Sequence, residues 1–369
     1  MNKKTCCIFN LAPHYRAPIY TLMDKELACD FYFGDDLGNQ IELMDYSALN
    51  GFKNVLKNKQ LKWSGFKWQS GVLSLLFKPY KYYIITGSPA FLSNWLLVIF
   101  SKFSKKKVYA WSHGLKKPVS TRGDIFRKTF YRLFDKIFLY GDHSREIMIK
   151  EGFKEDKLIP IYNSLDHEHQ LQLRNSLTET NIYIDFFKND DPVIIYVGRL
   201  QKSKKLNLLV LALKKLNKKG INCNLVLVGS DMGNTEIVDL ATNNNLEENI
   251  WFYGPCYDER IIGELFYNAS VCVSPGPVGL TALHSLTFGC PVISNNDFEN
   301  QMPEFEVIIP KKTGAFFEND DIDSLTERIS EWIYSSKEKR QLIRKDSYKI
   351  IDEKWNPKNQ IDIIKTYLN

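Results

Sequence analysis

The sequence lacks the patterns of a disulfide-rich or metal-binding protein. Its seven cysteines are odd in number, show no Cys-x-x-Cys spacing and lie mostly in apolar runs. We therefore expect reduced thiols in a cytosolic protein and neither a disulfide framework nor a zinc site. No cluster of His, Asp and Glu has metal-ligand spacing, so we expect no bound metal and no cofactor.

Long apolar segments are also missing. The longest apolar stretch, Ala90–Phe100, contains a serine and an asparagine, and it is shorter than the roughly 18–20 residues that span a bilayer. The apolar run near the N-terminus breaks at Asn10, too early for the core of a signal peptide. We expect neither a membrane span nor export.

Acidic residues are scarce in one part of the chain. Residues 51–150 hold 20 Lys and Arg against 4 Asp and Glu, although the net charge of the whole chain is only +6. Tryptophans alternate with the lysines of this block, namely Trp63, Trp68, Trp95 and Trp111. The block is either a solvated basic face or a surface for anionic lipid, and the tryptophans favour the membrane surface. Nucleic acid is not expected, since no recognition motif accompanies the charge.

With 369 residues, 44% of them hydrophobic, the chain is long enough for two domains. Short β-branched or aromatic runs alternate with helix-period segments, the pattern of parallel sheets with crossover helices. The expected strands are Thr5–Asn10, Phe31–Phe33, Tyr82–Thr86, Lys107–Trp111, Lys136–Tyr140, Leu158–Ile161, Val193–Val197, Asn224–Val228, Ile250–Tyr253, Val271–Ser274 and Pro291–Ser294.

This pattern predicts an α/β fold of two Rossmann-like domains. We expect one domain over 1–170 and another over 191–350, joined by a linker over 171–190 in which only 182–187 resembles a strand. A helical segment over 351–369 ends in an amphipathic run, so it must bury one face, and we expect it to pack back on the N-terminal domain.

Two strand ends carry residues that suit a phosphorylated ligand. After Val193–Val197, Gly198 lets the chain turn, and Arg199 and Lys204 follow. A guanidinium and an ammonium at such a place can converge on a diphosphate, although an ordinary basic loop is the plain alternative.

After Val271–Ser274, a turn with two glycines precedes a helix that begins at Leu280. We expect backbone N–H groups of this turn to meet phosphate oxygens, and plain turn chemistry is the alternative. The candidate residues of the turn are Gly276, Pro277, Val278, Gly279 and Leu280.

Three segments in order, VGRLQKSKK, LVLVGSDMGNTEIVDLATNNNLEENIWFYGP and DERIIGELFYNASVCVSPGPVGLTALHSLTFGCPVIS, resemble the C-terminal domain of retaining GT-B glycosyltransferases of family four. In the first half, WSHG and FDKIFLYGDHSREIMIKEGFKEDKLIPIYNSLD resemble the acceptor domain of that family. The resemblance implies a GT-B fold with a cleft between two facing domains, the N-terminal one for the acceptor and the C-terminal one for the nucleotide sugar.

The resemblance also implies roles for single residues. It gives Arg199 and Lys204 the grip on the donor diphosphate, and it places His113 near the donor sugar. It gives the turn 277–280 contacts with phosphates and sugar. His14 and Arg16 follow the first strand, where a phosphate or acceptor contact stays open, and the remaining histidines suggest surface positions.

The sequence departs from the family at its two usual glutamates. The resemblance places the first at Gly276 and the second at His284, so both carboxylates are missing. An imidazole at His284 can still bond a ribose hydroxyl, although packing inside the helix is the alternative. Asp297, Glu299 and Glu304 are candidate substitutes for the first carboxylate, or solvated loop acids.

We therefore expect a metal-independent, retaining glycosyltransferase with a nucleotide-diphosphate sugar donor and a glycolipid or polysaccharide acceptor. We expect it in the cytoplasm, peripheral on the inner face of a membrane, in surface-glycan synthesis such as that of lipopolysaccharide or capsule. A nucleotide-sugar epimerase and a non-catalytic glycan- or nucleotide-binding protein are the alternatives.

Overall fold

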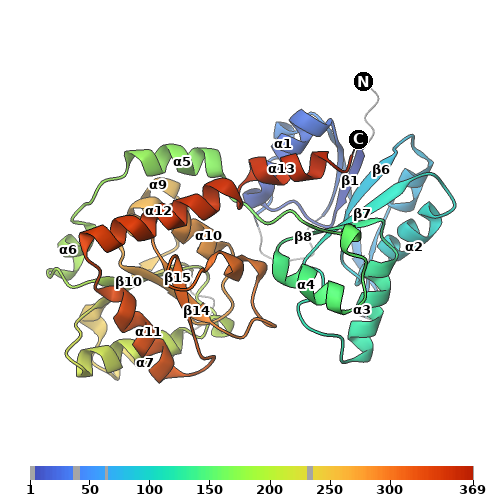
Figure 1. Cartoon of the computed structure of the whole chain (residues 1–369). Helices are drawn as coiled ribbons and strands as arrows, with labels where there is room; N and C mark the ends of the chain where they lie inside the picture. The colour runs from blue at the N-terminus through green and yellow to red at the C-terminus, as the bar shows by residue number, and fades with distance from the viewer. Residues whose placement is uncertain (1–4, 36–41, 63–64, 231–235, 369) are drawn as a thin grey trace. The chain divides into compact units, whose positions relative to one another are not determined.

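The computed structural model describes residues 5–35, 42–62, 65–230 and 236–368. The chain divides into two compact units (Figure 1). Unit 1 comprises residues 1–166 together with 356–369, and unit 2 comprises residues 167–355. Each unit contains one large parallel sheet with helices on both faces, which is the α/β class predicted from the sequence.

The sheet of unit 1 has seven parallel strands in the order β3-β2-β1-β6-β7-β8-β9. A short antiparallel pair, β4 with β5, stands apart from it. The bounds are β1 Thr5–Phe9, β2 Asp30–Gly34, β3 Phe52–Leu56, β4 Asn58–Gln60, β5 Lys67–Gln69, β6 Tyr82–Thr86, β7 Lys107–Ser112, β8 Lys136–Leu139 and β9 Leu158–Pro160.

Successive side chains of the central strands enter two different cores, because a strand alternates its side chains between the two faces of the sheet. Along β1, Cys6 and Ile8 join one core while Cys7 and Phe9 join the other. The unit therefore buries both faces of its sheet, and its central strands read as continuous apolar runs. Its helices are α1 Ala17–Leu27, α2 Leu92–Ser101, α3 Arg122–Arg132, α4 Asp142–Lys150 and α13 Pro357–Lys365, with 3-10 turns η1 His14–Arg16, η2 Tyr46–Ala48, η3 Leu73–Phe77 and η4 Glu155–Lys157.

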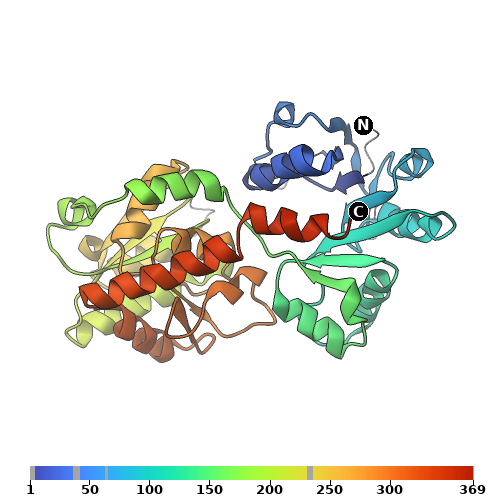
Figure 2. The ribbon, with the colours of Figure 1, turned by 45° about the horizontal axis from the view of Figure 1, so that its top comes forward.

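The C-terminal helix α13 packs beside α1 within unit 1 (Figure 2). The Lys365 ammonium pairs with the Glu26 carboxylate of α1. The Tyr109 hydroxyl of β7 donates to the carbonyl oxygen of Tyr367 (3.1 Å). The segment that belongs to unit 1 begins at Asn356, a few residues later than the expected start at 351.

The sheet of unit 2 has six parallel strands in the order β12-β11-β10-β13-β14-β15. Helices α7, α8 and α11 pack together, and α5, α9, α10 and α12 form a second group. The strands are β10 Val193–Val197, β11 Asn224–Val228, β12 Ile250–Gly254, β13 Val271–Ser274, β14 Val292–Asn295 and β15 Gly314–Phe317. The helices are α5 His167–Ser176, α6 Ile182–Phe187, α7 Leu206–Lys218, α8 Glu236–Thr242, α9 Glu259–Asn268, α10 Leu280–Thr287, α11 Ile322–Ile333 and α12 Lys337–Glu353, with 3-10 turns η5 Lys202–Lys204, η6 Glu247–Asn249 and η7 Pro303–Val307.

The expected linker over 171–190 is instead structured as part of unit 2. Most of α5 and all of α6 fall in this range. The segment 182–187, which resembles a strand in sequence, is helical because Tyr183 and Phe187 lie one turn apart and are both buried. The Tyr183 hydroxyl also donates to the carbonyl oxygen of Leu265 in α9 (2.6 Å).

In each sheet the strand order reverses direction once, between β1 and β6 in unit 1 and between β10 and β13 in unit 2. Open α/β sheets bind ligands at the carboxyl ends of the strands beside such a reversal. Among the described residues, no helix combines the length and apolar character needed to cross a bilayer.

Candidate functional site

The two candidate segments of unit 2 follow the strands that flank its reversal point. Residues 198–204 come after β10, and residues 275–279 come after β13. Both strands are buried and end at the same edge of the sheet, since they are parallel. The topology thus brings together two segments about 75 residues apart, as the sequence predicts.

Lys204 joins the two segments directly. Its ammonium donates to the carbonyl oxygen of Pro277 (2.6 Å), and its own carbonyl oxygen accepts from the Gly276 N–H (3.0 Å). Arg199 lies exposed at the end of β10, and no acceptor among the described residues takes its guanidinium. One cation is therefore fixed against the turn, while the other, exposed and without an acceptor in the described part of the chain, can meet a ligand.

The electrostatics of Lys204 show that the two cations influence each other. Burial lowers the pKa of Lys204, and the positive charge of Arg199 lowers it further, while Glu304 opposes the shift. An anion that binds between Lys204 and Arg199 would offset their repulsion. The pair is thus suited to a polyanionic ligand such as a diphosphate.

Fewer N–H groups of the turn are available than the sequence suggests. The Gly276 N–H is bonded to Lys204, Pro277 has none, and the Val278 N–H donates to Gln301 Oε1 (2.8 Å). The N–H groups of Gly279 and Leu280, at the start of α10, have no acceptor among the described residues. These two are the donors that the turn can offer to a phosphate.

Gly276 leaves no space for a side chain. A Cβ atom there would lie 2.3 Å from the carbonyl oxygen of Ser203 and 2.7 Å from Cα of Lys204. The backbone of η5 occupies the volume that a glutamate at this position would need. The local packing therefore excludes a carboxylate side chain at position 276.

A set of buried polar side chains holds this turn in place, and sequence reasoning missed it. Gln301, only 2% exposed, also donates to Ser294 Oγ (3.0 Å) and to the Asn295 carbonyl oxygen (3.0 Å). Asn295 donates in turn to the Pro275 carbonyl oxygen (2.8 Å). Their sequence, rich in asparagine and acids, resembles a solvated loop, and only the tertiary contacts show their role.

His284 has a protein partner that the sequence does not reveal. Its Nε2 lies 2.8 Å from Oε1 of Glu259, the first residue of α9, and Gln170 of α5 donates to the same oxygen. Glu259 is largely buried; burial favours its neutral form, but the bonds from His284 and Gln170 outweigh it and lower its pKa. The rings of Phe266 and Phe288 flank the imidazole. Position 284 thus presents an imidazole paired with a carboxylate from another helix.

The three candidate substitutes for the first carboxylate differ in their surroundings. Glu299 is exposed, and Asp297 accepts from Nδ2 of Asn300 (2.9 Å). Glu304 of η7 is 2% exposed, packs near α10 and raises the pKa of Lys204. Of the three, Glu304 is the one whose charge shifts the pKa of Lys204.

In unit 1, His113 lies just past the end of β7 and is half-buried, with its Nδ1 atom inaccessible to solvent. Burial, followed by the charges of Lys116 and Arg16, lowers its pKa to about 3, so the imidazole is neutral at physiological pH. Its Nδ1 has no hydrogen-bond partner among the described residues, and its ring centroid lies 4.7 Å from that of Tyr140. A neutral imidazole with an open ring nitrogen can orient a hydroxyl, and it cannot serve as an acid.

Arg16 lies near His113, at the start of α1. Its guanidinium lies over the rings of Trp111 (5.6 Å) and Tyr140 (4.9 Å) and donates to the Tyr140 hydroxyl. No carboxylate among the described residues pairs with it. His14 is half exposed and lies near Glu42 instead.

Two further groups have structural roles. His167, expected as an unpaired surface residue, lies 2.8 Å from Asp352, which also binds the buried Arg174.

The sequence contains one Asp-x-Asp, at 321–323, where Asp321 caps α11 and Asp323 pairs with Lys215. No group of three or more His, Cys, Asp or Glu side chains among the described residues could hold a metal ion.

Comparison with known proteins agrees with this arrangement. Residues 179–349, nearly the whole of unit 2, match the family described as Glycosyl transferases group 1. Solved structures of glycosyltransferases match the whole chain. The fold is GT-B.

HepE of Anabaena, solved in complex with UDP, has a TM-score of 0.68 and 15% identity, with 99% of both chains covered. The lipopolysaccharide outer core galactosyltransferase WaaB has a TM-score of 0.69 and 14% identity, with 98% of this chain and 99% of that one covered. An uncharacterized glycosyltransferase of Methanocaldococcus jannaschii is 27% identical over 151 residues, which are 38% of this chain. The match spans about a third of the length of that relative, 36%.

Proposed function

We propose that the protein transfers a sugar from a nucleotide-diphosphate donor to a hydroxyl of a glycolipid or polysaccharide acceptor, with retention at the anomeric carbon and without a metal. The observation that carries this proposal is the cation pair at the reversal point of unit 2, where Lys204 is bonded to the turn before α10 and the exposed Arg199 guanidinium has no acceptor among the described residues. The GT-B fold and the matched family domain support it. HepE, of the same fold, binds UDP and UDP-glucose.

The proposed chemistry depends on stabilising the leaving group. As the bond between the sugar and the diphosphate breaks, negative charge grows on the diphosphate oxygens. Arg199, Lys204 and the N–H groups of Gly279 and Leu280 would stabilise that charge from fixed positions. His113 would orient a sugar hydroxyl with its neutral imidazole.

A first test replaces each cation singly by alanine. We expect Arg199→Ala and Lys204→Ala each to lower turnover by two or more orders of magnitude, about 2.7 kcal/mol of transition-state stabilisation. The matched control is Lys202→Ala, which removes an exposed lysine of the same turn η5. Turnover is measured as donor hydrolysis without acceptor, after a thermal-shift screen of nucleotide sugars.

Wild-type turnover in a folded Arg199→Ala/Lys204→Ala double variant would exclude the proposed grip on the diphosphate. If the protein binds nucleotides but neither hydrolyses nor transfers from any donor, the alternative of a non-catalytic nucleotide-binding protein is favoured. The absence of carboxylates at positions 276 and 284 is the argument for that alternative. Chelation of metals should leave turnover unchanged, because no metal is part of the proposal.

A second test concerns the pair of His284 and Glu259, which we propose binds a ribose hydroxyl of the donor. His284→Ala should weaken binding of a ribonucleoside diphosphate by about 1–3 kcal/mol, because a polar partner is left unpaired. Glu259→Gln should cause part of this loss, since it removes the charge that fixes the imidazole. Calorimetry with the deoxyribose analogues is the control, because the effect of either variant should shrink when the hydroxyl is absent. An unchanged affinity of a folded His284→Ala variant would assign His284 to the helix core.

The acceptor class implies a place of action. We propose that the protein works at the inner, anionic face of a membrane, where glycolipid acceptors are held. The basic block over 51–150 supports this proposal.

A further inference from the structure

The amino-terminal edge of the unit 1 sheet carries exposed aromatic side chains among lysines. Residues 77–81 lead into β6, and residues 101–107 connect α2 to β7. These two segments hold six lysines and no acidic residue. We call the following set the amino-edge patch: Phe77, Lys78, Lys81, Phe100, Lys102, Phe103, Lys105 and Lys107.

Contacts between the two segments hold the patch together. The Lys106 ammonium donates to the carbonyl oxygens of Lys78 (2.7 Å) and Tyr80 (2.9 Å). The backbone N–H of Lys107 donates to the carbonyl oxygen of Lys81 (2.9 Å). The patch is therefore one continuous surface built on paired strands.

Its phenylalanines are unusually exposed. Phe77 is 92% exposed, Phe103 is 86% exposed and Phe100 is half exposed. A phenylalanine side chain gains on the order of 2 kcal/mol when it leaves water, so several on one surface indicate that something covers them. The tryptophans expected at this surface differ in their surroundings: Trp95 packs against Phe126 and Phe130, Trp111 is 2% exposed and Trp68 is half-buried in β5. Trp63 lies outside the described residues.

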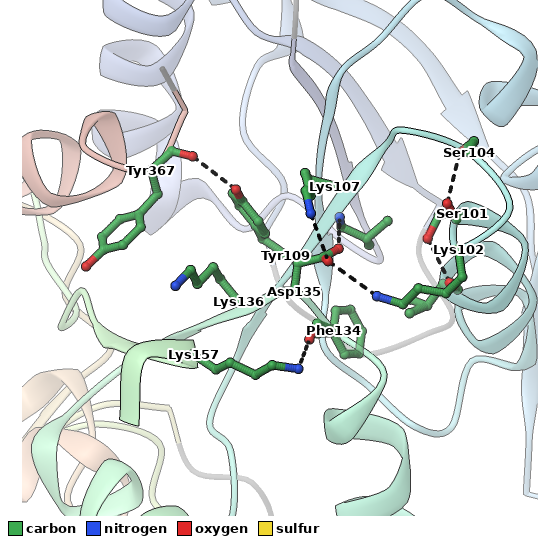
Figure 3. A network of polar contacts seen from close by, with 12 residues as sticks. Ser101, Lys102, Ser104, Lys107, Tyr109, Phe134, Asp135, Lys136, Lys157 and Tyr367 are labelled. Atoms are coloured by element: carbon green, nitrogen blue, oxygen red, sulfur yellow. Dashed lines mark hydrogen bonds and ion pairs between the residues drawn. The ribbon is translucent and has the colours of Figure 1, made fainter. Parts of the chain in front are cut away.

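The positive charge of the patch is poorly compensated. The Asp135 carboxylate forms ion pairs with both Lys102 (3.4 Å) and Lys107 (3.6 Å), as Figure 3 shows. It also accepts a hydrogen bond from the Val108 N–H. Lys78, Lys81 and Lys105 pair with no carboxylate among the described residues. A surface with this excess of charge complements an anionic partner.

We propose that the amino-edge patch docks on an anionic lipid bilayer, with Phe77 and Phe103 entering the headgroup region and the lysines facing lipid phosphates. This deepens the proposed function and rests on it for the presence of a membrane-held acceptor. Lysines that surround apolar side chains are the composition of membrane-surface segments. A nucleic acid would use the same charge, and it is an outcome of the test.

Docking through this edge leaves the opposite edge of the sheet uncovered. The patch precedes β6 and β7, whereas His113 follows β7. The six residues of β7 span about 20 Å. The lipid surface would therefore not block the carboxyl edge of this sheet, where His113 lies.

The experiment measures co-sedimentation of the full chain with phosphatidylcholine vesicles that either contain or lack phosphatidylglycerol. We expect binding only to the anionic vesicles and release by salt. Phe77→Ser/Phe103→Ser should lower the partition coefficient by on the order of tenfold or more. Lys78→Glu/Lys105→Glu should lower it by about thirtyfold or more, given about 1 kcal/mol, or about fivefold, for each lysine near the surface.

Matched controls come from unit 2. Tyr257→Ser removes an aromatic side chain that is 80% exposed, and Lys218→Glu/Lys349→Glu reverses two exposed lysines. These variants should partition within about threefold of the wild type. Equal losses in the patch and control variants would overturn the proposal, as would equal binding to neutral vesicles. Release from anionic vesicles by a short oligonucleotide, with tighter binding to that oligonucleotide, would assign the patch to nucleic acid.

Donor hydrolysis in the absence of vesicles separates this proposal from the proposed function. The patch variants should keep wild-type hydrolysis, because none of their residues belongs to the cation pair or its turn. If membrane binding depends on the patch but no sugar is transferred from any donor, the docking proposal is supported and the proposed transferase activity is refuted.

Discussion

Acid should destabilise unit 1 through His113. The pKa of this imidazole is lowered from 6.5 to about 3 by burial and by the charges of Lys116 and Arg16. Between these two values the unfolded chain binds a proton that the folded chain does not, so the stability that depends on a neutral His113 falls as the pH falls. It is fully present above about pH 6.5 and is lost progressively toward pH 3.

The size of the effect follows from the shift. Each pH unit below 6.5 costs about 1.4 kcal/mol, so lowering the pH from about 7 to about 4 should remove about 3 kcal/mol of the free energy of unfolding. His113→Asn removes the titrating group. The variant should be less stable than the wild type near neutral pH. Because the variant does not lose the stability that depends on a neutral His113, the difference in free energy of unfolding should shift by about 3 kcal/mol in its favour at about pH 4.

The assay is urea denaturation of the full chain at both pH values, with the transition of unit 1 assigned by hydrogen exchange of the β7 amides. His14→Asn is the control, because it removes a half-exposed histidine of the same unit. Identical pH dependence of stability in the wild type and His113→Asn would refute the argument. So would a histidine NMR signal, assigned to His113 by the variant, that titrates near 6.5.

Two further predictions concern unit 2. Gly276→Ala should cost about 1–3 kcal/mol of stability and weaken nucleotide binding, because its Cβ would meet the backbone of Ser203 and Lys204. Gly279→Ala is the control: the atom nearest to its Cβ would be 4.0 Å away, so its thermal denaturation should be close to that of the wild type. The pKa of Asp352 is lowered by His167 and Arg174 against the opposing effect of burial, so the stability from this carboxylate should be present above about pH 4 and lost below it. Asp352→Asn should therefore destabilise unit 2 at neutral pH by about 1–2 kcal/mol and less so in acid, and equal destabilisation at both pH values would contradict the assigned ion pair.

Local sequence predicts the central strands well because these strands are buried on both faces. β6, β10, β11 and β13 have the bounds that their apolar runs predict. Of the four edge strands, β9 and β12 were predicted, whereas β3 and β15 were not. In β3 three consecutive residues are exposed, and β15 follows a polar turn, so neither shows a continuous apolar run.

The candidate site could be predicted only where its residues directly follow strands of the sheet. Arg199, Lys204 and the turn before α10 follow strands that periodicity identifies, and the parallel topology brings them together. The partner of His284 lies 25 residues away on another helix, and the buried amide of Gln301 lies 23 residues from the turn that it holds. Side-chain pairs of this kind depend on how helices pack, which one sequence does not determine.

The glycine at 276 and the position of Lys204 depend on each other. Lys204 donates to the Pro277 carbonyl oxygen and accepts from the Gly276 N–H, and its backbone fills the space that a side chain at 276 would need. A carboxylate at 276 could enter only if η5 moved away, and that movement would also displace the ammonium from the turn. The local charge is therefore set by Arg199 and Lys204 against Glu304, which is buried and raises the pKa of Lys204. The turn between β13 and α10 carries no carboxylate and offers the N–H groups of Gly279 and Leu280, while the segment after β10 supplies Arg199 and Lys204. A diphosphate is the ligand that this combination favours.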